Sequence, residues 1–179
     1  MERGLQARVA EGSDPDAIEL YFLRHAHAGN PASWSGPDDL RPLSAKGERQ
    51  AERLGRFLAS VGFRPDAIIT SPKARAARSA EIVAVALEME VRVDDRLGGP
   101  LDLVSIEAIL FDADEPVRPV LVGHDPDFSE LVSMLCGAQD LQVRKGALAR
   151  VDAARPLSPS TGTLRWLIPP DLLQGRSDR

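Results

Sequence analysis

The chain has 179 residues, of which 43% are hydrophobic, and it carries a formal net charge of −5 at pH 7. This length and hydrophobic content fit one compact domain with an ample core. The negative net charge argues against a nucleic-acid partner, because proteins that bind the phosphate backbone are usually basic. No apolar run is long enough for a signal peptide or a membrane span, so we expect no membrane partner.

The single cysteine, Cys136, cannot form a disulfide within the chain, so a reducing cytoplasm is the expected location. Cys136 lies in an apolar stretch and has no basic residue near it in the sequence. We therefore expect it to pack in the interior and not to act as a nucleophile. Residues 1–16 are polar and contain Gly, Ser and Pro, which predicts a flexible N-terminal arm.

A first strand is expected at residues 18–23, where an apolar run ends directly in Arg24 and His25. The stretch 29–42 is rich in Gly, Pro, Ser and Asp, which predicts a loop. A strand that ends in this way would bring two reactive side chains to one edge of a sheet.

Two helices are expected next, separated by a short strand at residues 67–69. Ser44 is expected to cap the first helix, which runs to about Ser60, because apolar residues recur there at three- and four-residue spacing. Ser71 is expected to cap the second helix, of about fifteen residues, with Pro72 at its first position.

The rest of the chain continues to alternate between strands and helices. The expected elements are a strand at 91–93, a helix at 102–111, a strand at 117–122, a helix that ends near Gly137, and strands at 147–151 and 163–168. This order predicts one α/β domain at residues 17–170 with a central, mostly parallel sheet and helices on both faces, followed by a tail at 171–179. Ligands of such folds bind beyond the carboxyl ends of the strands. His25, Ser71 and His124 each follow an expected strand, so we expect them to meet there.

Four segments of the chain resemble the histidine phosphatase superfamily, also called the phosphoglycerate mutase-like family, and within it the small SixA-type phosphohistidine phosphatases. The resemblance runs in the expected order over about residues 20–170, and it implies a phosphoglycerate mutase-like fold. The matching segments are Leu23-Arg24-His25-Ala26, Arg41-Pro42-Leu43-Ser44-Ala45-Lys46-Gly47, Ser71-Pro72-Lys73-Ala74-Arg75-Ala76 and Val122-Gly123-His124-Asp125-Pro126.

The resemblance implies roles for two histidines and three arginines of these segments. His25 would be the nucleophile and would form a covalent phosphohistidine intermediate, with its second ring nitrogen donating to a fixed acceptor. Arg24 and Arg75 would bind the phosphoryl group, with Arg41 as a third member, because a planar guanidinium matches phosphoryl oxygens. His124, preferably protonated, would donate a hydrogen bond to the same group. No cofactor is implied.

Two other interpretations of these residues were weighed. His25, His27 and His124 could form a three-histidine metal site, but Arg24 and Arg75 would place positive charge beside the cation. We therefore expect no metal ion, and we place His27 at the rim of the pocket or on the surface.

Arg78 follows Arg75 by three residues and is either part of the phosphate site or a solvated residue.

The substrate prediction depends on a residue that is missing. Many family members that cleave phosphomonoesters carry a glutamate after the third strand as general acid, whereas residues 94–100 contain none and offer only Asp95 as a substitute. Phosphohistidine needs no dedicated strong acid, because its leaving imidazole is readily protonated. We therefore expect a metal-independent phosphatase that acts on phosphohistidine in proteins. The alternatives are a small-molecule phosphomonoesterase of the same superfamily and a non-catalytic domain that binds a phosphorylated ligand.

Overall fold

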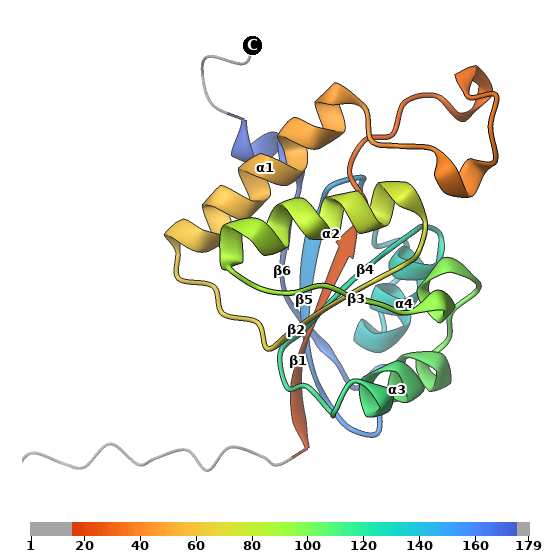
Figure 1. Cartoon of the computed structure of the whole chain (residues 1–179). Helices are drawn as coiled ribbons and strands as arrows, with labels where there is room; N and C mark the ends of the chain where they lie inside the picture. The colour runs from red at the N-terminus through yellow and green to blue at the C-terminus, as the bar shows by residue number, and fades with distance from the viewer. Residues whose placement is uncertain (1–15, 175–179) are drawn as a thin grey trace, which may run out of the picture.

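The computed structural model describes residues 16–174, so all but the last residue of the expected N-terminal arm, and residues 175–179 of the tail, lie outside it. A six-stranded sheet in the order β3-β2-β4-β1-β5-β6 forms its centre (Figure 1). The four strands β3, β2, β4 and β1 are parallel to one another. β5 is antiparallel to β1, and β6 is antiparallel to β5. The strands are β1 (Ala17–Arg24), β2 (Ala67–Thr70), β3 (Arg92–Val93), β4 (Pro119–Gly123), β5 (Leu148–Ala154) and β6 (Thr163–Ile168).

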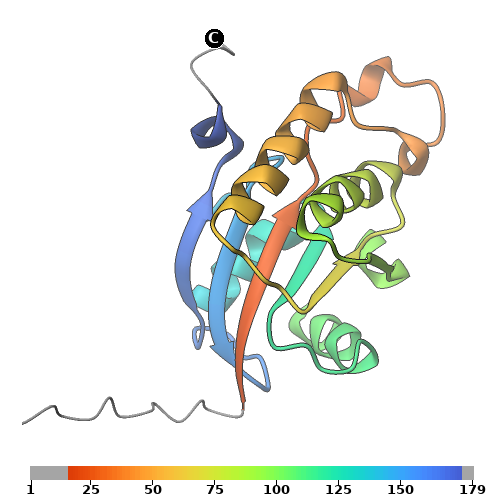
Figure 2. The ribbon, with the colours of Figure 1, turned by 60° about the vertical axis from the view of Figure 1, so that its left-hand side comes forward.

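Helices cover both faces of the sheet, which confirms the predicted α/β architecture (Figures 1 and 2). One pair of long helices packs on each face. The helices are α1 (Ala45–Ser60), α2 (Ala74–Leu87), α3 (Leu103–Asp112) and α4 (Asp127–Cys136), with short 3-10 helices η1 (Pro31–Ser33), η2 (Asp38–Leu40), η3 (Asp95–Gly98) and η4 (Pro170–Leu173). No helix of this part of the chain is long and apolar enough to cross a membrane.

The alternation of side chains along β1 divides the core into two layers. Leu20 and Phe22 pack on the side of α3 and α4, whereas Tyr21 and Leu23 pack on the side of α1 and α2. Successive side chains of a strand point to opposite faces, so each layer takes every second residue. All four residues are at most 2% exposed, which fixes β1 firmly at the centre of the sheet.

The two helices after β1 begin differently. The Ser44 side chain accepts a hydrogen bond from the N–H of Gly47, which confirms the predicted cap of α1. The predicted cap of α2 is wrong: Ser71 and Pro72 precede the helix, and Lys73 occupies the cap position without a side-chain hydrogen bond. Ser71 Oγ instead accepts from the N–H of Lys73 and lies 2.8 Å from His124 Nε2.

The first residues of the predicted tail, 171–173, form part of a short helix. β6 ends at Ile168 as expected, but Pro170 then begins η4. Leu173 of this short helix packs against the apolar cluster that contains Leu54 and Leu58 of α1. Residues 170–173 therefore belong to the packed domain.

Candidate active site

The carboxyl ends of β1, β2 and β4 bring together the residues that the sequence singled out. Arg24 ends β1 and pairs with Gly123 at the end of β4, so His25 and His124 follow at neighbouring positions. Their ring centroids are 5.1 Å apart. Gly123 makes room for the ring of Phe128 beneath this site, because a Cβ there would lie 2.6 Å from that ring.

His25 has the geometry of a nucleophile. Its Nδ1 donates a hydrogen bond to the carbonyl of Ala26 at 2.7 Å, as predicted, so its lone pair lies on Nε2. The side chain is buried, and burial lowers the pKa of His25 to about 3, with Arg75 and Arg24 contributing by charge repulsion. His25 is therefore neutral at pH 7, the form that can attack phosphorus.

His124 is also neutral. Burial lowers its pKa to about 3, and the charges of Arg75 and Lys73 add to that effect. The expected protonated form is therefore absent from the unliganded protein, because the imidazolium would lie in a buried and already cationic site. A neutral ring still carries one N–H, so His124 retains the capacity to donate a hydrogen bond to a phosphoryl oxygen.

The three predicted arginines lie around the histidines. Arg24 donates to a carboxylate oxygen of Asp125 at 2.8 Å and to the carbonyl of Val143 at 3.0 Å. Arg75 and Arg41 are both 6% exposed, and both contact the carboxylate of Asp38, at 3.0 Å and 2.8 Å. The phosphate site therefore already holds an anionic group of the protein itself.

Three buried nitrogen atoms at this site have no hydrogen-bond partner within residues 16–174. They are Nε of Arg24, Nε of Arg75 and Nδ1 of His124. Buried polar atoms are nearly always paired in folded proteins. Unpaired nitrogens on three side chains that surround a neutral histidine are what we expect of a site that binds an anionic ligand.

Comparison with known proteins agrees with this geometry. The model of the histidine phosphatase superfamily (branch 1) matches residues 20–98. An uncharacterized protein of Picosynechococcus sp. is 32% identical over 166 residues, which are 85% of this chain and the whole of that protein. The chain belongs to the histidine phosphatase superfamily.

Two further proteins resemble this chain. A probable phosphoglycerate mutase GpmB of Klebsiella pneumoniae is 34% identical over 62% of this chain, and the match spans 52% of that protein. The structure of the protein histidine phosphatase SixA complexed with tungstate superposes with a TM-score of 0.75 at 22% identity, over 88% of this chain and all of that one. This structural likeness confirms the predicted fold.

Arg78 and His27 lie outside the predicted phosphate site. Arg78 is exposed and pairs with Glu48 and Glu81, so it is a solvated residue of α2. His27 lies in a groove beside the site, with its Nδ1 2.7 Å from Ser44 Oγ. Among residues 16–174, no three His, Cys, Asp or Glu side chains gather as a metal ion would require. Cys136 is partly buried against the core, and burial raises its thiol pKa.

The loop of residues 94–100 passes close to Ser71: a Cβ at Gly98 would lie 3.4 Å from Ser71 Oγ. Asp94 binds the side chain of Arg96, and Asp95 is exposed at the start of η3.

Asp38 is the acidic residue of the site that sequence reasoning missed. It lies in η2, within a loop without periodic pattern, and nothing in its local sequence indicated that it would contact Arg41 and Arg75. Hydrogen bonding from Arg41 lowers the pKa of Asp38, and the charge of Arg75 acts in the same direction. Asp38 is therefore ionised at neutral pH and is a poor proton donor.

Proposed function

We propose that this protein is a metal-independent phosphatase that hydrolyses phosphohistidine on proteins through a phosphorylated His25. The observation that carries the proposal is the pairing of a neutral, oriented His25 with Asp38, a carboxyl group of the same site that Arg41 holds ionised and that is therefore a poor acid. Such a site suits a leaving group that needs no strong acid. The imidazole of phosphohistidine is such a leaving group, whereas an alkoxide is not.

In the first step, Nε2 of His25 attacks phosphorus while the bond from phosphorus to the substrate imidazole breaks. The leaving nitrogen takes a proton from solvent. Arg24 and Arg75 balance the charge on the phosphoryl oxygens, and His124 donates its N–H to one of them. For this to occur, the phosphoryl group replaces the Asp38 carboxylate on Arg41 and Arg75.

In the second step, water attacks the phosphorylated His25 and inorganic phosphate leaves. The bond between phosphorus and Nε2 breaks, its electron pair returns to Nε2, and the protons of the water leave with the phosphate. Nδ1 keeps its proton throughout, in its hydrogen bond to the Ala26 carbonyl. The enzyme therefore returns to its starting tautomer without a metal ion or a cofactor.

A substrate panel tests this proposal. A phosphorylated histidine phosphotransfer protein, free phosphohistidine and several phosphomonoesters are compared in the presence of EDTA, with wild type and His25→Ala. We expect phosphate release from the phosphohistidine substrates by wild type alone, and a phosphorylated His25 after rapid acid-free quenching.

Each alternative has its own outcome in this panel. Rapid turnover of phosphomonoesters with phosphohistidine untouched would replace the proposal with a small-molecule phosphatase. Tight phosphate binding without turnover of any substrate would indicate a binding domain. Activity that persists in His25→Ala would refute the covalent mechanism.

A further inference from the structure

A basic groove of about 490 Å³ opens beside the phosphate site and shares Arg24 with it. Its other charged lining residues are Lys46, Arg144 and Lys145, with one carboxylate, Asp171. Within residues 16–174, neither lysine nor Arg144 forms an ion pair. On a protein of net charge −5, such uncompensated positive charge concentrates anions locally.

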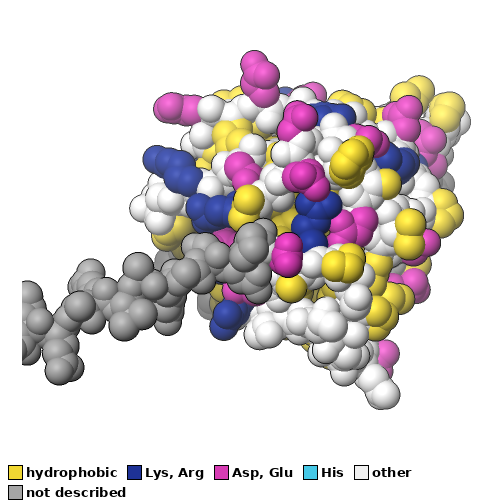
Figure 3. All heavy atoms as spheres, turned by 90° about the horizontal axis from the view of Figure 1, so that it is seen from below, with side chains coloured by type: hydrophobic (Ala, Val, Ile, Leu, Met, Phe, Trp, Pro, Cys, Tyr) yellow, Lys and Arg dark blue, Asp and Glu magenta, His cyan; other side chains and the backbone are white. Residues whose placement is uncertain are grey.

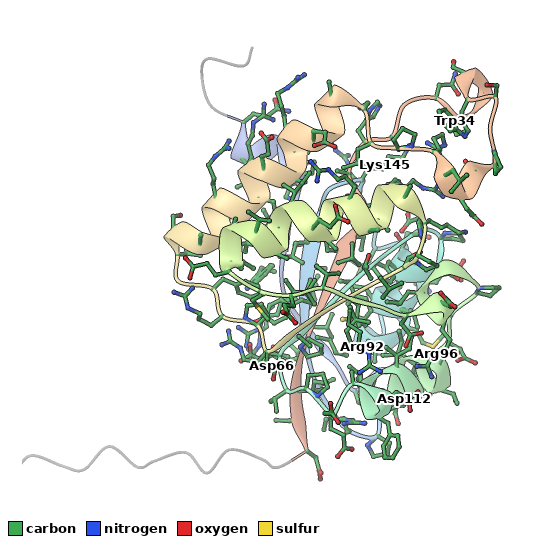
Figure 4. The ribbon with its side chains drawn as sticks, in the orientation of Figure 1. Trp34, Asp66, Arg92, Arg96, Asp112 and Lys145 are labelled. Atoms are coloured by element: carbon green, nitrogen blue, oxygen red, sulfur yellow. The ribbon has the colours of Figure 1, made fainter. Side chains whose placement is uncertain are left out.

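Lys145 is the residue that links the groove to the phosphate site. It is partly buried, and burial lowers its pKa, with the positive charges of Arg24 and Arg41 adding to the effect. Figure 4 shows Lys145 near the end of α1 that follows the loop carrying η1 and η2. A partly buried lysine among arginines is stabilised most effectively by a bound anion.

His27 also lines this groove, together with Lys46 and Lys145. Its Nδ1 lies 2.7 Å from Ser44 Oγ and 3.3 Å from the backbone nitrogen of Gly29. Burial lowers the pKa of His27, and the charges of Lys46 and Lys145 act in the same direction. The groove therefore places a polar imidazole beside its cationic groups.

The basic lining continues along α1. A second groove of about 500 Å³ shares Lys46, Gln50 and Gln174 with the first, and it is also lined by Arg49 and Arg53. Residues three, four and seven apart lie on one face of a helix. At 1.5 Å per residue, this face extends about 10 Å from Lys46 to Arg53. This face is longer than a single phosphoryl group or a small phosphate ester.

We propose that the two grooves bind an acidic segment of the substrate protein, next to its phosphorylated histidine. The proposal rests on the proposed function. The phosphoryl group would occupy the site of Arg24 and Arg75, and carboxylates that follow it would contact Lys145 and then Lys46. The length of the basic face favours a peptide over a small phosphate ester, and its positive charge favours a peptide that is acidic.

The first experiment measures selectivity. Two peptides of equal length each carry one histidine phosphorylated with phosphoramidate; four glutamates flank it in one and four glutamines in the other. We expect wild type to prefer the acidic peptide in kcat/KM by about tenfold, and a Lys46→Gln/Lys145→Gln variant to lose most of that ratio. Single exposed ion pairs contribute only about two- to fivefold each.

The matched control removes positive charge elsewhere. Arg92 is an exposed residue of β3, outside both grooves, and Figure 4 shows it far from Lys145. The selectivity ratio of Arg92→Gln should equal that of wild type. The proposal would be overturned if the ratio of kcat/KM values for the two peptides were one in wild type. It would also be overturned if that ratio were unchanged in the double variant, or if Arg92→Gln lowered it equally.

The second experiment needs no turnover. Fluorescence anisotropy measures binding of labelled hexaglutamate and hexaglutamine peptides, neither phosphorylated, to wild type, to the double variant and to Asp171→Asn. We expect wild type to bind only hexaglutamate, the double variant to bind it at least fivefold more weakly, and Asp171→Asn to bind it more tightly. Raising salt from 0.1 to 1 M should abolish binding, because the Debye length falls from about 10 Å to about 3 Å.

The two experiments separate the failure of this inference from the failure of the proposed function. If phosphohistidine is not hydrolysed but hexaglutamate binds through Lys46 and Lys145, the function is wrong and the acidic-segment site stands. If phosphohistidine is hydrolysed without any charge dependence, only the inference is wrong. If hexaglutamate fails to bind while a second phosphate on a small phosphate ester raises kcat/KM through the lysines, the occupant is a small molecule and the peptide proposal is overturned.

Discussion

The two ends of the sheet both carry hollows and arginines, but within residues 16–174 only the carboxyl end combines histidines with buried, unpaired guanidinium nitrogens. At the amino end of β1, a cavity of about 500 Å³ is lined by Ile18, Glu107 and Arg155 among others. Arg155 is bound there by Glu107 at 2.8 Å and by Glu115 at 3.4 Å. Figure 3 shows this end as a mixture of acidic, basic and hydrophobic side chains without a visible histidine.

At the carboxyl end, by contrast, some of the arginine N–H groups have no hydrogen-bond partner in the described part of the chain. Arg24 and Arg75 each retain a buried Nε without a partner in the described chain, and both lie near His25. The difference shows that a cavity of a given size does not identify an active site. Unpaired donors around a neutral nucleophile do.

The largest effect expected at the active end is that of His25→Ala. Removal of the nucleophile should lower kcat for phosphohistidine by about 10⁴-fold or more. The measurement is phosphate release, with circular dichroism to show that the fold is retained. Residual activity within a hundredfold of wild type would mean that another residue accepts the phosphoryl group.

The second effect compares two arginines of α2. Arg75→Gln removes a buried guanidinium from the phosphate site and should lower kcat/KM by about 10²–10³-fold. Arg78→Gln removes an exposed guanidinium from the same helix, where it pairs with Glu48 and Glu81, and should change kcat/KM by less than about threefold. Equal losses in the two variants would place Arg78 in the site as well.

A third variant tests the opposite end. Glu107→Ala removes the acceptor for Arg155 and for the N–H of Leu157, so we expect a loss of about 1–2 kcal/mol in the free energy of unfolding. The values of kcat and KM should match those of wild type. Chemical denaturation and the phosphate-release assay measure the two quantities, and a fall in kcat would couple the two ends.

The smallest expected effect is an NMR chemical shift that does not change with pH. Because burial lowers the pKa of His25 and of His124 to about 3, their ring resonances should stay constant from pH 8 to pH 5 in an NMR titration. The unfolded chain takes up protons near pH 6.5, so both residues make the folded state less stable as pH falls from about 6.5 towards 3. A midpoint near 6.5 for either ring would show that the ring is solvated.

Local sequence patterns predicted the elements and the main residues of the site. The apolar run before Arg24 and His25, and the run before His124, place these residues at the ends of parallel neighbouring strands, and the structure confirms this. Ser44 could be predicted as a cap because capping is a local interaction. Ser71 could not, because its hydroxyl lies beside His124, a residue 53 positions away.

The parts that could not be predicted depend on contacts between distant segments. Asp38 meets Arg75 across 37 positions, from a loop without a repeating pattern. The groove around Lys145 forms only where the start of α1 and the segment before β5 come together. A net charge of −5 conceals such a local concentration of basic residues.

The Asp38 carboxylate across Arg41 and Arg75 has a consequence for the rate at which phosphate leaves. Once His25 is free again, this tethered carboxylate competes with inorganic phosphate for the same two guanidinium groups, and it is always present at high effective concentration. For a phosphatase of the proposed mechanism, product inhibition should therefore be weaker than two buried arginines alone would produce. In Asp38→Asn, the inhibition constant for phosphate should fall several-fold.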